Sequence, residues 1–177
     1  MKRFFLSLLI LLQVSSALSV IAAPITSTGT TEVFFSPNGG ATQAVVGEIG
    51  HARQEVLVQA YSFTSKPIAK ALLDAHKRGV KVVAVLDKSQ RTQKYSGATF
   101  LANAGIPVYI DSQHAIAHNK VMVLDRSTLI TGSFNFTAAA EGKNAENLLV
   151  IKGNKPLVDK YIANFETHRT HSEPYTR

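Results

Sequence analysis

The chain has 177 residues, a net charge of +7 and no cysteine. Its length suits one domain with its own core and gives no reason to expect a second. Without cysteine no disulfide framework is possible, so burial alone must stabilise the fold. The basic balance favours a polyanionic partner, although scattered lysines and arginines are also typical of a solvated surface.

The first residues have the form of a signal peptide. A short basic start, Met1-Lys2-Arg3, precedes the apolar residues 4–12, and small residues follow at Ala22 and Ala23. Polar residues interrupt the apolar stretch, which falls short of the roughly 20 apolar residues that a spanning helix needs. We therefore expect residues 1–23 to be a cleaved leader, with an uncleaved membrane anchor as the alternative.

The remaining residues, 24–177, are predicted to form a single exported domain, periplasmic or secreted. Its first half alternates helices with strands, each recognised by the spacing of its apolar residues. In chain order we expect a helix over residues 41–52, a strand over 55–63, a helix over 65–78, a strand over 80–86, a helix over 97–104 and a strand over 108–110.

The second half has shorter connections between its strands. We expect strands over residues 118–124, 128–131 and 147–151, a hairpin at residues 125–127, and a last helix that opens at Asn154 before a frayed tail from Thr167. The fold class is therefore α/β, with a mixed, largely parallel β-sheet sandwiched by helices.

A histidine, a lysine and an aspartate stand close together in the first of these later strands. His118 and Lys120 are two residues apart, so on a strand they share one face, whereas Asp125 has the opposite parity. An imidazole beside an ammonium suits a phosphate, because the lysine neutralises its oxygens while the histidine reacts. Asp125 would hold the strand end. A histidine and a lysine of an ordinary exposed strand are the alternative.

Further polar residues follow the next two strands. Ser133 and Asn135, in Gly132-Ser133-Phe134-Asn135, share parity and could donate hydrogen bonds to phosphate oxygens, although such a segment is often only a turn. Glu146 opens the following strand, and its carboxylate could accept a hydrogen bond from His118 Nδ1, which would leave Nε2 free to act. Taken alone, an exposed glutamate at a strand start needs no function.

This pattern resembles the HKD signature of the phospholipase D superfamily. The resemblance is carried by His118-x-Lys120-x4-Asp125 followed by Gly132-Ser133-x-Asn135, and it covers residues 31–168. Within the superfamily the chain is most similar to the small exported, Nuc-like endonucleases with a single HKD motif. Residues 60–64, 77–80 and 132–137 carry that closer likeness, and the mitochondrial single-HKD enzymes are more distant.

The resemblance implies a phosphodiesterase domain that works through a phosphohistidine. One HKD histidine attacks phosphorus and a second protonates the leaving oxygen. With one motif per chain, a symmetric homodimer would share one site. It also implies that His118, Lys120, Asp125 and Glu146 are the catalytic set, with Asp125 structural and Glu146 orienting the histidine, and that Lys120, Ser133 and Asn135 bind the substrate.

Neither a metal nor a cofactor is expected. His114 and His118 have the spacing H-x3-H, but no adjacent glutamate supports zinc, and His168 and His171 lie in the polar tail. A basic loop with Lys88, Arg91 and Lys94 could contact a nucleic-acid backbone or be merely solvated.

Three functions remain open on the sequence alone. A nonspecific endonuclease on DNA, and possibly RNA, is favoured by the Nuc-like segments and the basic charge. A phospholipase D acting on phospholipid headgroups would use the same site, but no amphipathic entry segment is evident outside the leader, and no stable membrane insertion is expected after its cleavage. A non-catalytic anion-binding domain would require a lost motif residue, and every motif residue is present.

Overall fold

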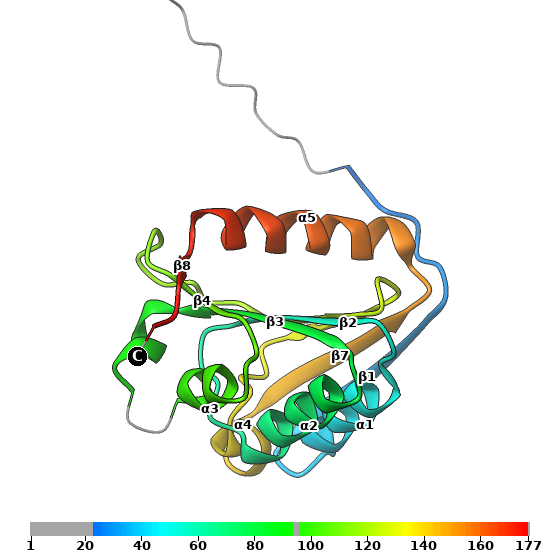
Figure 1. Ribbon diagram of the computed structural model, residues 1–177. Coiled ribbons are helices and arrows are strands. Elements are labelled where there is room, and N and C mark those ends of the chain that lie inside the picture. Colours follow the sequence, from blue (N-terminus) through cyan, green and yellow to red (C-terminus); the bar gives the residue numbers. More distant parts are fainter. Residues whose placement is uncertain (1–22, 94–95, 177) are drawn as a thin grey trace, which may run out of the picture.

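The computed structural model describes residues 23–93 and 96–176. Within these ranges the chain forms one eight-stranded sheet with helices on both faces (Figure 1). The predicted leader lies outside the described residues except for Ala23. Across the same two ranges, no helix combines the length and the apolarity that crossing a membrane requires.

The strands and helices alternate along the chain in the first half, as predicted. The strands are β1 (Thr30–Ser36), β2 (Glu55–Ala60), β3 (Lys81–Asp87), β4 (Val108–Asp111), β5 (Lys120–Leu124), β6 (Thr128–Gly132), β7 (Glu146–Lys152) and β8 (Glu173–Pro174). The helices are α1 (Ala41–His51), α2 (Lys66–Lys77), the 3-10 helix η1 (Lys88–Arg91), α3 (Gly97–Asn103), α4 (Ala138–Gly142) and α5 (Lys155–His171).

The sheet is mixed, with the strand order β1-β7-β6-β5-β2-β3-β4-β8. Strand β3 runs parallel to β2, and β4 runs parallel to β3. The crossover helices α2 and α3 make this possible, because each returns the chain to the end of the sheet at which the previous strand began. The other neighbouring strands are antiparallel. A mixed sheet between helices is thus confirmed, but its parallel part is smaller than expected, since β1 and β8 add antiparallel edges and β5 pairs antiparallel with β2.

Each face of the sheet carries its own apolar core. On one face α1, α2 and α3 pack on the sheet, and the side chains of Phe63, Phe134 and Phe136 are buried among them. On the other face α5 contributes Val158, Ile162 and Phe165 against residues of β2, β3, β5 and β6. Figure 1 shows this layering, with α5 alone above the sheet and the other labelled helices below it. The sheet therefore lies between two apolar cores, one on each of its faces.

Two predictions near the chain's second half need correction. The tail was expected to fray from Thr167, but α5 continues to His171, and β8 then pairs with β4. The apolar side chain of Phe165 and the hydrogen bond from Tyr175 N to Val108 O, 2.8 Å long, hold this end in place. His118 was expected on a strand, but β5 begins at Lys120, so His118 lies in the loop just before it.

We expect Gly97→Ala to destabilise the fold and Gly47→Ala to stabilise it. A Cβ at Gly97 would lie 2.1 Å from Cδ1 of the buried Phe63, whereas a Cβ at Gly47, inside α1, would meet no atom within 4 Å. Overpacking should cost about 1–3 kcal/mol, and removing a helical glycine should add about 0.5–1 kcal/mol. Chemical denaturation measures both; equal stability of the two variants would contradict the packing described at Phe63.

Candidate active site

Four strand ends bring the predicted site residues to one end of the sheet. The order β7-β6-β5-β2 is antiparallel throughout, so the start of β5 lies beside the end of β2, and the end of β6 lies beside the start of β7. In this register Lys120 pairs with Ala60, and Gly132 pairs with Leu148. Residues that are far apart in sequence therefore gather at one sheet end.

His118 and Lys120 form the centre of this group. The His118 side chain is exposed, whereas Lys120 is buried, with 7% of its surface accessible. Lys120 Nζ donates a hydrogen bond to the carbonyl oxygen of His118 at 3.0 Å. The ring of Tyr61 lies 4.7 Å from the His118 ring, and Lys120 Nζ lies 5.2 Å from the centre of the Tyr61 ring. The three side chains make one compact polar cluster.

Burial gives the Lys120 ammonium an unusual electrostatic state. Burial lowers its pKa below the ordinary lysine value, and the Glu146 carboxylate opposes this by favouring the charged form. The ammonium is thus held in a partly dehydrated place with a neutral carbonyl as its hydrogen-bond acceptor. Such a cation gains most from an anion that arrives beside it, because the attraction is weakly screened there.

Glu146 does not make the contact that the sequence suggested. The described residues of this chain show no hydrogen bond between Glu146 and His118; instead, Asn144 Nδ2 donates to Glu146 Oε1 at 3.1 Å. The backbone of Glu146 is fixed by Ser36, whose hydroxyl oxygen accepts its N–H at 3.1 Å. Glu146 therefore acts on Lys120 through charge, and its predicted role at His118 has no support from this geometry.

The segment that follows β6 lies against β7. Gly132 has φ of 150°, and a Cβ there would lie 2.3 Å from Asn147 O, so only glycine allows this close approach. Ser133 Oγ accepts a hydrogen bond from Asn147 N at 3.0 Å. Asn135 Oδ1 is buried and has no hydrogen-bond partner among the described residues. This oxygen only accepts hydrogen bonds, so a phosphate oxygen would have to be bound by the NH2 group of the same amide.

Asp125 stands apart from the other motif residues. It follows Leu124 at the far end of β5, where its carboxylate accepts hydrogen bonds from the backbone N–H groups of Arg53, Gln54 and Glu55 at 2.7–3.0 Å. Burial of this carboxyl raises its pKa, but these three hydrogen bonds outweigh that effect and lower the pKa overall. Asp125 and Arg126 have φ of 48° and 54°, as a tight hairpin turn requires. Asp125 secures the β2–β5 pairing.

Two residues near the candidate site were not predicted from the sequence. Tyr61 contacts both His118 and Lys120, and Asn147 donates to Ser133 from its backbone and side chain. Tyr61 had a usable signal, because it stands at the end of a predicted buried strand, where polar site residues of such sheets collect. Asn147 had none, since its partner lies on a different strand.

The other candidate residues lie elsewhere. His114 turns towards α5, where its ring stacks on His168 at 4.8 Å, so the H-x3-H spacing with His118 does not form a site. In the basic loop, Lys88 Nζ donates to His114 O and Arg91 pairs with Glu173 at 2.9 Å. Lys94 lies outside the described residues. The two described basic side chains therefore make contacts within the chain.

Comparisons with known proteins point to one family. The family described as "Cardiolipin synthase, PLD-like domain" matches residues 45–169. The phospholipase D of Rickettsia felis is 44% identical over 131 residues, which are 74% of this chain and 65% of that protein. The chain thus spans less than two thirds of that relative's length. The mitochondrial cardiolipin hydrolase of Xenopus laevis is 31% identical over 125 residues, 71% of this chain and 59% of that protein.

A solved structure agrees with these sequence matches. The crystal structure of Nuc from Salmonella typhimurium, a phospholipase D family member, superposes with a TM-score of 0.80 and 39% identity. The match covers 84% of this chain and 99% of that one. The similarity therefore extends over most of this chain and nearly all of the solved structure.

We expect Asp125→Asn to lower the free energy of unfolding by about 2 kcal/mol at pH 7, because an amide accepts the three backbone hydrogen bonds more weakly. The folded-state pKa of Asp125 lies below the unfolded value of 3.8. Its stabilisation is therefore present above that value and is lost as the pH falls through the folded pKa. Denaturation curves at several pH values should show that the difference in free energy of unfolding between the wild type and Asp125→Asn becomes smaller in acid.

The exposed Asp159 provides the matched control, since it pairs only with Lys155 on the surface of α5 among the described residues. Asp159→Asn should change stability by less than about 0.5 kcal/mol. The structural role of Asp125 would be refuted if Asp159→Asn lost as much stability as Asp125→Asn. It would also be refuted if the stability loss of Asp125→Asn stayed constant down to low pH.

Proposed function

We propose that this chain, which belongs to the phospholipase D superfamily and resembles its single-motif Nuc-like branch, is a phosphodiesterase that acts on nucleic acids. The observation that carries the proposal is that the exposed imidazole of His118 and the buried ammonium of Lys120 belong to neighbouring residues at one sheet end, where Lys120 Nζ donates to the backbone carbonyl oxygen of His118. The imidazole is free to react, and the ammonium is placed to neutralise phosphate oxygens.

The reaction proceeds in two steps. The imidazole of His118 attacks phosphorus, so that a P–N bond forms while a P–O bond breaks, and a second imidazolium gives its proton to the leaving oxygen. Water then attacks the phosphohistidine, loses its proton to the second imidazole and releases His118. Lys120, the hydroxyl group of Ser133 and the amide NH2 group of Asn135 donate hydrogen bonds to the phosphate oxygens.

The second imidazole comes from the partner's His118 in a symmetric homodimer. A two-fold axis through the site sets the two imidazoles on opposite sides of one phosphorus without any further residue. Exposed apolar side chains flank the site and suit a subunit contact: Phe35 is 64% exposed on β1, and Ile116 is 58% exposed two residues before His118. Phe35 pairs in register with Asn147, next to Glu146.

A nonspecific nuclease is the first candidate because the chain carries a net charge of +7 and a sequence pI of about 9.7. Such a balance attracts a polyanion at long range. Hydrolysis of phospholipid headgroups is the second candidate, since relatives bear the names phospholipase D and mitochondrial cardiolipin hydrolase. Export to the periplasm or medium, after cleavage of the leader, fits the first candidate.

The purified domain should degrade plasmid DNA in excess chelator, and its rate on DNA should exceed its rates on RNA and on phospholipid vesicles. His118→Ala should abolish turnover, whereas His51→Ala, at the exposed end of α1, should retain the wild-type rate. Agarose gels and headgroup release measure the three substrates side by side. A higher rate on phospholipid vesicles than on DNA would favour the phospholipase. A circular-dichroism spectrum in chelator shows whether a loss of activity results from unfolding.

Mixing experiments should reveal the shared site. If wild-type protein and His118→Ala are unfolded together and refolded in equal amounts, about one quarter of the dimers carry two histidines, so activity per dimer should fall to about one quarter rather than one half. Sedimentation confirms that the mixture is dimeric. Mixing with His51→Ala should cause no loss. A linear fall with the wild-type fraction, or an active monomer, would exclude the shared site.

A further inference from the structure

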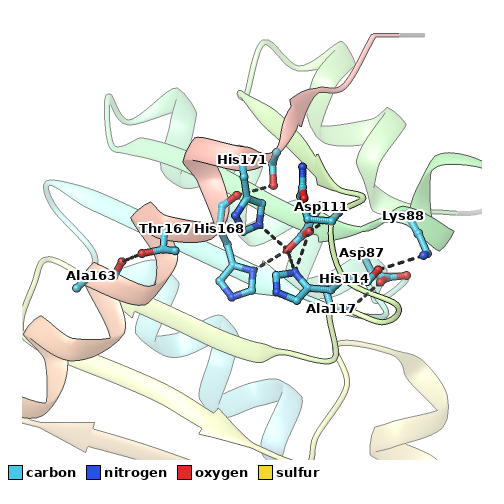
Figure 2. Close-up of polar contacts among 11 residues, drawn as sticks. Asp87, Lys88, Asp111, His114, Ala117, Ala163, Thr167, His168 and His171 are labelled. Atoms are coloured by element: carbon cyan, nitrogen blue, oxygen red, sulfur yellow. Dashed lines mark hydrogen bonds and ion pairs between the residues drawn. The ribbon is translucent and has the colours of Figure 1, made fainter. Parts of the chain in front are cut away.

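A second polar cluster lies beyond the candidate active site, at the end of β4. Asp111, the last residue of β4, is surrounded by His114 from the following loop and by His168 and His171 from the last turn of α5. Figure 2 shows the three imidazoles pointing at the Asp111 carboxylate. Oδ2 of Asp111 lies 2.6 Å from His168 Nδ1, 3.0 Å from His114 Nδ1 and 3.3 Å from His171 Nε2.

A buried carboxylate lies at the centre of the cluster. The Asp111 side chain has no accessible surface, and ring nitrogens of His168, His114 and His171 lie within hydrogen-bonding distance of its oxygen atoms. The C-terminal end of α5, next to it, adds the negative end of a helix dipole. The buried carboxylate and the helix end together favour a cation at this place.

The donor atoms lie close together, with the three imidazoles directed at the Asp111 carboxylate. One ligand atom from each of the four residues can be chosen so that all lie within 4.8 Å of one another. Tetrahedral zinc with bonds of about 2.0–2.1 Å requires donor separations of roughly 3.3 Å, so the side chains must rotate to surround the ion. Three imidazoles and one carboxylate are donors that Zn²⁺ accepts. We propose that Asp111, His114, His168 and His171 bind one Zn²⁺ ion.

Neighbouring groups hold the four residues in position. Gln113 N donates to Asp111 Oδ1 at 3.1 Å, Lys88 Nζ donates to His114 O at 3.0 Å, and Ser172 Oγ donates to His168 O at 2.6 Å. Metal sites depend on such outer contacts, which orient the ligands before the ion binds. His114 is the most exposed ligand, at 46%, and stands at the mouth of the cluster.

The ion has a structural role, because four protein ligands complete its coordination and leave no position for substrate. It joins β4, the loop that leads to His118, and the end of α5. This departs from the sequence-based expectation of no metal, which considered His114 only with His118 and left His168 and His171 in a frayed tail.

Calorimetry with zinc chloride tests the site on protein that has been treated with chelator and then freed of it. The wild type should bind one Zn²⁺ per chain, and its melting temperature should rise by several degrees at saturating zinc. His114→Ala/His171→Ala should lose at least about tenfold in affinity and most of the thermal shift. X-ray absorption of the loaded protein should show nitrogen and oxygen ligands near 2.0–2.1 Å.

Two controls separate this cluster from other histidines. His51→Ala/His76→Ala should bind zinc as the wild type does, and so should His118→Ala, which removes the imidazole of the candidate active site. Should the double ligand variant not fold, as judged by circular dichroism, the exposed ligand alone is replaced in His114→Gln. Absence of saturable binding by the wild type, unaltered affinity in the folded ligand variant, or lost binding in His118→Ala would overturn the proposal.

Discussion

The antiparallel pairing of β5 with β2 is the interaction on which the candidate site depends. At one end of this pair, the Asp125 carboxylate accepts three backbone N–H groups at the start of β2. At the other end, the same register sets Lys120 opposite Ala60 and beside Tyr61. Because side chains alternate along a strand, a slip of one residue would turn Lys120 to the opposite face of the sheet. The hydrogen bonds of Asp125 at one end of the pair thus help to fix the position of Lys120 at the other end.

The site is formed at some cost in stability. The Lys120 ammonium is buried with a carbonyl oxygen as its acceptor, and Asn135 has an unsatisfied buried oxygen. Either feature would be unfavourable in a purely structural protein, because buried polar groups are normally paired. The two apolar layers around α5 and around α1 to α3 supply the stability that tolerates them. The buried ammonium of Lys120 is consistent with a site that is complete only when an anion is bound.

Local patterns in the sequence were sufficient for most helices and central strands, since apolar spacing and glycine or proline at their ends are local signals. The helix α2 and the hairpin between β5 and β6 are examples. Pairing between distant strands had no such signal. No strand was predicted over Thr30–Ser36, and this segment becomes β1 because β7 offers an antiparallel edge. The parallel character of the sheet was overestimated for the same reason.

The site shows the same division between local and distant information. The spacing of His118 and Lys120 was readable, whereas the proximity of Tyr61 arises from β5 returning beside β2. Glu146 was expected to contact His118. Its orientation depends instead on contacts with Asn144 and Ser36, which no sequence pattern predicts. His168 and His171 were expected to be solvated because the tail is polar, and their hydrogen bonds to the buried Asp111 could not be predicted from a local pattern.

The loop that carries His118 is held from two sides, neither of which belongs to the HKD motif. Ala117 N donates to Asp87 Oδ2 at 2.8 Å, so the end of β3 fixes the residue next to His118. Earlier in the same loop, His114 bonds to Asp111 at the end of β4. Asp87 and Asp111 are paired in register, and both are buried. Two buried carboxylates on adjacent parallel strands thus orient a loop whose exposed imidazole is otherwise free, which is the preorganisation that a reactive histidine requires.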